Sequence, residues 1–336
     1  MKQLFSLLLL CSLSWVSAQK VESPTGTLVL TFQLTPDGQP TYAVSYKNKP
    51  VVLSSALGVS LKDKTALVNH FEVKGTTTHA VNETWKPVLG EQAQIVNHYN
   101  ELIVALVQKD SKVKLNLVFR AFDEGVAFRY DFPKQENLNY FIISDEKTEF
   151  NLTENNKVLW IPGDFDSNEY VYNETKFSEI DNEKLNLNNG IGVKSIPGKY
   201  TVQTPLQMKS PSGLYLNIFE AAVVNYPVMH LDANVQKYTL KANLVPNAIG
   251  DKAYLQAPCV SPWRTIMVSD DARKIVSSKM ILNLNEPSKI EDTSWIKPMK
   301  YVGIWWEMHV GKSTWDYAGS QNAQNAAGNP IPTGKH

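Results

Sequence analysis

Residues 113–132 read VKLNLVFRAFDEGVAFRYDF, and apolar side chains occupy every second position on both sides of the DEG triplet at 123–125. This alternation is typical of strands that bury one face, and a short Gly-containing turn between two such strands favours a β-hairpin. Polar residues fill the alternate positions: Lys114, Asn116, Arg129 and Asp131. The stretch therefore predicts two antiparallel strands with one face in a core.

The same pattern recurs along the chain. Residues 27–34 and 42–46 alternate on either side of a Pro-Asp-Gly turn at 36–38, which predicts a second hairpin. Shorter strand-like runs lie at 102–107, 213–219, 253–255 and 265–268. Many short alternating strands separated by turns are typical of a large antiparallel sandwich, so the fold class is predicted as mainly β.

Helical patterns are scarce before residue 269. Ser269, Asp270 and Asp271 form a capped acidic first turn, which predicts one short helix over 272–276. The apolar residues Met280, Leu282 and Leu284 then alternate and predict one further strand.

Composition limits the class of protein. The chain has 336 residues, which favours roughly two domains at about 150 residues each, and 43% are apolar. Its 33 basic and 33 acidic residues give no net charge, which argues against nucleic-acid binding because a phosphate backbone attracts a basic surface.

The N-terminus has the pattern of a cleaved secretory signal over residues 1–18. A basic start precedes the apolar run from Leu4 to Leu13, which is shorter than the about 20 residues that span a bilayer. We therefore expect an exported protein without a membrane span, with the periplasm as its destination. Cys11 leaves with the signal, so Cys259 remains alone and is interpreted as a buried structural thiol.

The pattern changes after the Asn285-Glu286-Pro287 turn. Residues 301–306, YVGIWW, are continuously apolar and predict a strand buried on both faces, as in a parallel (β/α)₈ barrel. The chain stops far short of the roughly 200 residues of such a barrel, so we expect a truncated one. His309 and His336 flank this strand and keep a functional interpretation, whereas four histidines are interpreted as structural or surface residues: His70, His79, His98 and His230.

Several reaction classes lack their motifs. The sequence contains no Gly-rich phosphate loop, no G-x-S-x-G elbow and no closely spaced His or Cys metal pair. Residues 160–170, WIPGDFDSNEY, crowd Asp164, Asp166 and Glu169 beside two aromatic residues, which offers oxygen ligands for Ca²⁺ and ring faces for a sugar. Spacing alone favours a solvated acidic loop here.

Five separated motifs resemble those of glycoside hydrolase family 97, most closely its starch-utilisation α-glucosidase branch. They are WIPGD at 160–164, EY at 169–170, NHYNEL at 97–102, PWRTI at 262–266 and YVGIWW at 301–306. The resemblance implies an N-terminal β-super-sandwich, a catalytic (β/α)₈ barrel and a small C-terminal β domain. We therefore expect the sandwich over residues 19–292 and the truncated start of the barrel over 293–336.

The resemblance also implies a site. Family members hold a Ca²⁺ ion between sandwich and barrel, and the matching motif makes Glu169 a calcium ligand. Trp305 corresponds to a residue near the substrate, and a sandwich loop that reaches the sugar falls on Gly190, Ile191 and Gly192. The catalytic acid and base would lie beyond His336, so this chain carries no catalytic residue.

The function implied is an α-glycoside hydrolase, in particular a monomeric, calcium-dependent, inverting α-glucosidase that acts on starch-derived oligosaccharides. In such an enzyme one carboxylic acid protonates the glycosidic oxygen while a carboxylate activates water on the opposite face. Two alternatives stay open: a retaining α-galactosidase of the same family, and a non-catalytic carbohydrate-binding sandwich.

Overall fold

The structure is a computed structural model that describes residues 18–185, 195–301, 305–306 and 310. The chain divides into two compact units, residues 1–287 and 288–336. Residues 1–17, which hold nearly all of the predicted signal, lie outside the described part. Among the described residues, no helix is long and apolar enough to cross a membrane.

The first unit is built from antiparallel sheets. The 8-stranded sheet has the order β1 (Gln19–Glu22), β2 (Leu28–Leu34), β3 (Pro40–Tyr46), β4 (Lys49–Ala56), β11 (Glu149–Leu152), β18 (Thr239–Leu244), β17 (Met229–Asn234) and β14 (Thr201–Gln203). The 3-stranded sheet has the order β19 (Ala253–Gln256), β10 (Tyr140–Glu146) and β5 (Val59–Leu61).

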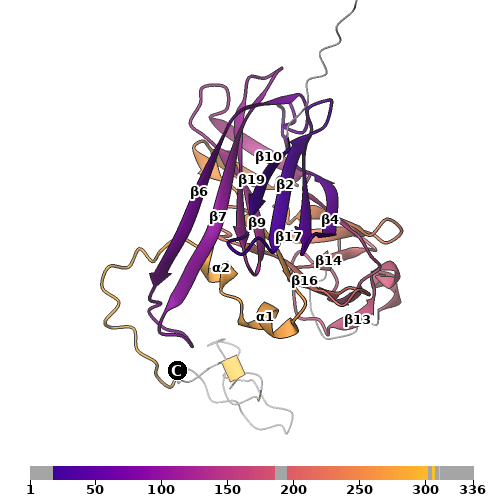
Figure 1. Cartoon of the computed structure of the whole chain (residues 1–336). Helices are drawn as coiled ribbons and strands as arrows, with labels where there is room; N and C mark the ends of the chain where they lie inside the picture. The colour runs from indigo at the N-terminus through magenta and orange to yellow at the C-terminus, as the bar shows by residue number, and fades with distance from the viewer. Residues whose placement is uncertain (1–17, 186–194, 302–304, 307–309, 311–336) are drawn as a thin grey trace, which may run out of the picture. The chain divides into compact units, whose positions relative to one another are not determined.

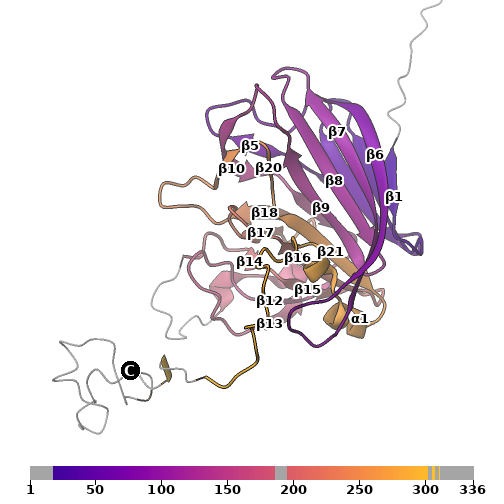
Figure 2. The ribbon, with the colours of Figure 1, turned by 90° about the vertical axis from the view of Figure 1, so that its left-hand side faces the viewer.

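The 10-stranded sheet holds the longest strands, β6 and β7, which run side by side in Figure 1 and again in Figure 2. Its order is β13 (Asn173–Lys176), β12 (Lys157–Trp160), β15 (Leu206–Lys209), β16 (Tyr215–Ala221), β21 (Trp263–Ser269), β9 (Gly125–Phe132), β8 (Lys114–Phe122), β7 (Ile95–Gln108) and β6 (Phe71–Trp85), and β20 (Cys259–Val260) pairs with β9.

Both predicted hairpins are confirmed. In the first, β8 pairs with β9 from Asn116↔Asp131 to Phe122↔Gly125. Gly125 is required at the turn, because a Cβ there would lie 2.5 Å from the Ile266 carbonyl oxygen of β21. The second hairpin joins β2 and β3.

The two large sheets pack face to face, and aromatic rings fill the space between them. Phe119 and Phe128 of the 10-stranded sheet meet Phe32 and Tyr42 of the 8-stranded sheet, with ring centroids 5.7 Å apart for Phe32–Phe119 and 4.7 Å for Tyr42–Phe128. All four side chains are almost completely buried. The mainly-β sandwich is therefore confirmed, and its stability comes from apolar burial between sheets.

The predicted helix is confirmed as α1 (Ala272–Ser277), whose N-cap Asp271 accepts the backbone N–H of Arg273. The predicted strand after it is wrong, because residues 280–283 form the short helix α2 (Met280–Asn283). Met280 and Leu284 are buried together in a core cluster while Leu282 is 47% exposed, so the apolar spacing of four residues is the one used. Two 3₁₀ turns, η1 (Phe177–Glu179) and η2 (Asn182–Lys184), complete the described elements.

The predicted barrel strand is wrong at its described positions. Tyr301 lies outside any strand, and Trp305 and Trp306 are exposed residues in a helical turn; residues 302–304 lie outside the described part. A strand needs neighbours for its backbone N–H and C=O groups, and no strand of the described ranges pairs with Tyr301, Trp305 or Trp306.

Candidate functional site

A cavity of about 720 Å³ opens where a loop after β12 meets the ends of β14, β16 and β17. The loop contributes residues 164–169, and the strands and their connections contribute Gln203, Thr204, Pro205, Phe219, Glu220, Val223, Val228, Met229, His230 and Val245.

Asp164 organises the loop from within. Its Oδ1 accepts the backbone N–H groups of Asp166 at 2.8 Å and of Ser167 and Ser195 at 3.2 Å, and its Oδ2 accepts the Tyr170 hydroxyl. Burial alone would raise the pKa of this carboxyl, but these hydrogen bonds outweigh it and lower the pKa. Asp164 is therefore a charged brace for the loop, with both oxygens occupied.

A second brace comes from β17. His230 Nε2 donates to the Asp164 carbonyl oxygen at 2.7 Å, and the imidazole stacks on Phe165 with centroids 5.7 Å apart. Its Nδ1 is buried and has no hydrogen-bond partner among the described residues. Burial lowers the pKa of His230, so the ring is neutral at neutral pH. Gln203 fastens the loop further by donating to the Ser167 carbonyl oxygen at 2.7 Å.

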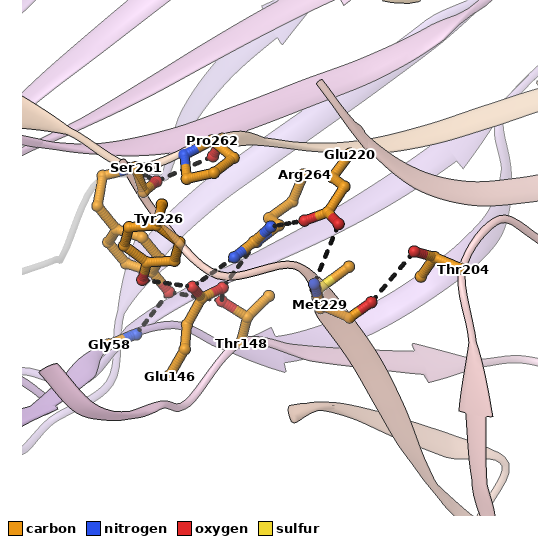
Figure 3. A network of polar contacts seen from close by, with 11 residues as sticks. Gly58, Glu146, Thr148, Thr204, Glu220, Tyr226, Met229, Ser261, Pro262 and Arg264 are labelled. Carbon is orange, nitrogen blue, oxygen red and sulfur yellow. Dashed lines mark hydrogen bonds and ion pairs between the residues drawn. The ribbon is translucent and has the colours of Figure 1, made fainter. Parts of the chain in front are cut away.

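One residue that lines the cavity, Glu220, belongs to a buried ionic network, which is drawn in Figure 3. Arg264, which is completely buried, donates to Glu220 at 2.5 Å and to both oxygens of Glu146 at 2.9 and 2.7 Å. Tyr226 also donates to Glu146. Glu220 in turn accepts the backbone N–H of Met229 at 3.0 Å, which ties the network to the strand that carries His230.

The Arg264 guanidinium thus binds both Glu146 and Glu220, but the pKa of one carboxyl is lowered and that of the other is raised. Burial dominates at Glu220 and raises its pKa despite Arg264. At Glu146 burial acts in the same direction, but the charge and hydrogen bonds of Arg264, with help from Tyr226, lower the pKa. Of the two, Glu146 therefore holds the negative charge more strongly.

The predicted site residues lie as follows. Glu169 lines the cavity and is exposed. Trp305 is 57% exposed and belongs to the second unit, with its ring 5.9 Å from that of Trp306. Gly190, Ile191 and Gly192 lie outside the described residues, as do His309 and His336.

The described part of the cavity does not form a calcium site by itself. Ca²⁺ takes six to eight oxygen ligands. Within the described ranges no group of three or more His, Cys, Asp or Glu side chains could hold a metal ion. Glu169 is placed to supply one carboxylate at the cavity wall, whereas the oxygens of Asp164 already accept hydrogen bonds. The described residues therefore cannot supply a full set of calcium ligands by themselves.

Sequence reasoning missed Glu220 and His230 as cavity residues. A signal for Glu220 was present, because Leu216, Ile218 and Glu220 share the buried face of β16. A carboxylate on the apolar face of a strand needs a buried partner, which here is Arg264. His230 was interpreted as structural or surface; it is 5% exposed and braces the site loop.

Cys259 is half-buried rather than buried. It packs against the main core, and burial raises the pKa of its thiol to about 11. The thiol is therefore protonated and unreactive at neutral pH, in keeping with a structural role.

The sandwich matches a known protein family. The family model described as "Glycosyl-hydrolase 97 N-terminal" matches residues 21–287, which is nearly the whole first unit. This chain belongs to glycoside hydrolase family 97. The family resemblance predicted from the sequence is therefore confirmed.

Relatives of this family 97 chain are longer than it is. It is 25% identical over 341 residues to a retaining alpha-galactosidase of Bacteroides thetaiotaomicron, an alignment that covers 91% of this chain and 47% of the relative. A family 97 enzyme of Pseudoalteromonas sp. strain K8, solved with acarbose and also with panose, is 34% identical with a TM-score of 0.76. Those matches cover 88% of this chain and 42% of the enzyme, so the chain spans less than half of each of these relatives.

Proposed function

We propose that this chain is the N-terminal sandwich of a calcium-dependent, inverting α-glucosidase that acts on starch-derived α-linked oligosaccharides. The observation that carries the proposal is the similarity to a relative solved with α-linked oligosaccharides. The chain is 34% identical, over 88% of its length, to a family 97 enzyme solved with acarbose and panose.

Glu169 has the role of a calcium ligand in this proposal. Its carboxylate lies at the cavity wall, on a loop whose backbone Asp164, Gln203 and His230 hold by hydrogen bonds. Such bracing reduces the conformational entropy lost when a ligand binds, so Glu169 is partly preorganised. The ion would neutralise carboxylate charge and keep that side of the active site in place.

The acid and base of the reaction come from outside the described residues. An inverting enzyme needs one protonated carboxyl and one free carboxylate about 6.5 to 9.5 Å apart. Asp164 accepts four hydrogen bonds and Glu220 is bound to Arg264, so neither meets that need. The chain would instead supply substrate contacts, through Trp305 and the segment Gly190, Ile191 and Gly192, together with the calcium ligand.

A retaining α-galactosidase is the second candidate, because two curated relatives, at 25% and 23% identity, are described as a retaining alpha-galactosidase and a probable retaining alpha-galactosidase. A retaining enzyme uses one carboxylate as the nucleophile, with the pair about 5 to 5.5 Å apart. A non-catalytic carbohydrate-binding sandwich would bind sugar without cleaving it.

Hydrolysis by the complete protein separates these candidates. We expect release of 4-nitrophenol from the α-glucoside in large excess over the α-galactoside, and ¹H NMR of the first product from maltose to show the β-anomer. A preference for the α-galactoside with an α-anomeric product would establish the retaining alternative. Binding of maltoheptaose without any cleavage would support the non-catalytic carbohydrate-binding sandwich.

The calcium role is tested by titrating the activity of Glu169→Gln with Ca²⁺ after removal of metal by a chelator. Loss of one charged ligand should raise the calcium concentration for half activity, and excess Ca²⁺ should restore part of the rate by mass action. Asp166→Asn is the matched control, since Asp166 is also an exposed carboxylate of the loop and bonds the Ser195 hydroxyl. An equal shift in both variants would refute the assignment.

Export to the periplasm and a monomeric state belong to the same proposal. Fractionation of cells that produce the complete protein should place it with periplasmic markers, and its N-terminal sequence should begin at Gln19. Sedimentation should give the mass of one chain.

A further inference from the structure

The outer face of the 3-stranded sheet carries two exposed tyrosines on neighbouring strands. In the pairing of β10 with β19, Tyr140 lies opposite Gln256, and Ile142 lies opposite Tyr254. Directly opposed residues share a face, so these four side chains form one surface. Tyr140 is 66% exposed and Tyr254 is 56% exposed, whereas Phe141 and Leu255 between them point into the core.

Polar groups surround this surface, which we name the tyrosine face (Tyr140, Ile142, Tyr254, Gln256 and Lys62). A groove of about 620 Å³ runs over it and is also lined by Asp63 and Lys64. The Lys62 backbone N–H donates to the Ile142 carbonyl oxygen at 2.9 Å, which extends the surface across to the β5 side.

Hydrogen bonds hold part of the face in place. The Tyr254 hydroxyl donates to Asp251 at 2.6 Å, and Lys62 forms an ion pair with the same carboxylate at 2.9 Å. Asn247 donates to the Tyr254 hydroxyl at 3.3 Å. The ring of Tyr254 is thus tethered at its hydroxyl while more than half of its surface stays in contact with water, an arrangement that lowers the entropy lost on binding.

We propose that the tyrosine face is a second, non-catalytic binding site for α-linked gluco-oligosaccharides; the sugar class rests on the proposed function. A pyranose presents an apolar C–H face to aromatic rings and hydroxyl groups to amide, carboxylate and ammonium groups. Tyr140 and Tyr254 supply the rings, and Gln256, Asp63 and Lys64 supply both donors and acceptors. The two lysines and two aspartates balance in charge, which suits a neutral polyhydroxyl ligand.

The face is separate from the cavity that contains Glu169, because the two share no lining residue. In Figure 2, β5 and β10 lie above β14, β16 and β17, the strands whose ends line the cavity. A glucan bound at the tyrosine face would therefore leave the cavity open and raise the local concentration of chain ends for hydrolysis. The KM for long glucans should depend on this face, and the KM for aryl glucosides should not.

Affinity electrophoresis of the complete protein in native gels that contain amylopectin tests the proposal. The wild type should be retarded, and Tyr140→Ala, Tyr254→Ala and their double variant should bind about fivefold or more weakly, as expected when an aromatic anchor is removed. Tyr140→Phe keeps the ring and should keep most of the binding. Tyr200→Ala is the matched control, because Tyr200 is 38% exposed and lines neither the groove nor the cavity.

Kinetics give the second readout. The double variant should raise KM for amylopectin about fivefold or more and leave kcat and the hydrolysis of 4-nitrophenyl α-glucoside unchanged. Equal retardation of wild type and double variant would overturn the inference. So would alanine variants with lowered melting temperatures and unchanged retardation, because the face would then be covered by protein.

The proposed function can fail independently. Retardation that depends on the tyrosines in an enzyme without α-glucosidase activity would uphold the binding site and reject the proposed reaction. Tyrosine-dependent retardation by galactomannan instead of amylopectin would reject the ligand class.

Discussion

Asp164 and Glu220 line the same cavity but are held in opposite ways. Neutral donors surround Asp164, three of them backbone N–H groups, and they lower its pKa. Glu220 depends on one buried guanidinium that it shares with Glu146, and burial raises its pKa. Asp164 therefore controls the local order of its loop, whereas Glu220 belongs to a network on which the whole sandwich depends.

The largest expected effect follows from removal of Arg264. Arg264→Met keeps the volume but leaves Glu146 and Glu220 buried without a cation, so we expect a loss of about 3 to 5 kcal/mol in the free energy of unfolding. Urea denaturation measures this loss. Adding Glu146→Gln and Glu220→Gln to Arg264→Met should recover much of this loss. If Arg264→Met alone were as stable as wild type, the core carboxylates would not depend on Arg264.

Asp164→Asn should act locally. The amide has one acceptor oxygen and a group that cannot accept the Tyr170 hydroxyl, so local opening of the loop should become easier by about 1 to 3 kcal/mol. Hydrogen exchange should accelerate at the amides of Asp166, Ser167 and Ser195, with the amides of β8 and β9 unchanged. Faster exchange in β8 as well would show that the loop and the core are not separate.

The pH dependence of stability should distinguish the two carboxyls by sign. The lowered pKa of Asp164 gives stability that is present above 3.8 and lost as pH falls through the folded-state value. The raised pKa of Glu220 gives stability that is present below 4.5 and lost as pH rises through its folded-state value.

Urea midpoints of Asp164→Asn and Glu220→Gln between about pH 3 and pH 7 measure this difference. The deficit of Asp164→Asn relative to wild type should be largest at neutral pH, and that of Glu220→Gln should be smallest there. Parallel profiles for the two variants would contradict the assigned directions.

The smallest effect is expected at Asp271, a carboxylate that caps the short helix α1 and lines no cavity named above. Its side chain accepts the backbone N–H of Arg273 at 3.0 Å at the start of α1, and its interactions with Arg273 lower its pKa to about 2. Asp271→Ala should lower the melting temperature less than Arg264→Met and leave calcium dependence and activity unchanged. A loss as large as that of Arg264→Met would contradict this ranking.

Local pattern was sufficient wherever the structure depends on neighbours in sequence. The hairpins β2–β3 and β8–β9 follow from alternation around a turn, and α1 follows from its Asp271 cap. The same method failed at α2, because Met280, Leu282 and Leu284 satisfy both a strand and a helix pattern. It also failed at Tyr301 and Trp305, where a strand would need partners that the pattern does not supply.

The sequence by itself determined the sandwich class, the family and the place of Glu169 in an acidic loop, because these depend on periodicity and on motifs within a few residues. Only the tertiary structure decided that Asp164 braces that loop instead of offering oxygens to a metal, and that His230 supports it from β17. Arg264 and Glu146 are 118 residues apart in the chain yet form one buried network. Such contacts are set by how the sheets pack, and local periodicity carries no record of which distant residues that packing brings together.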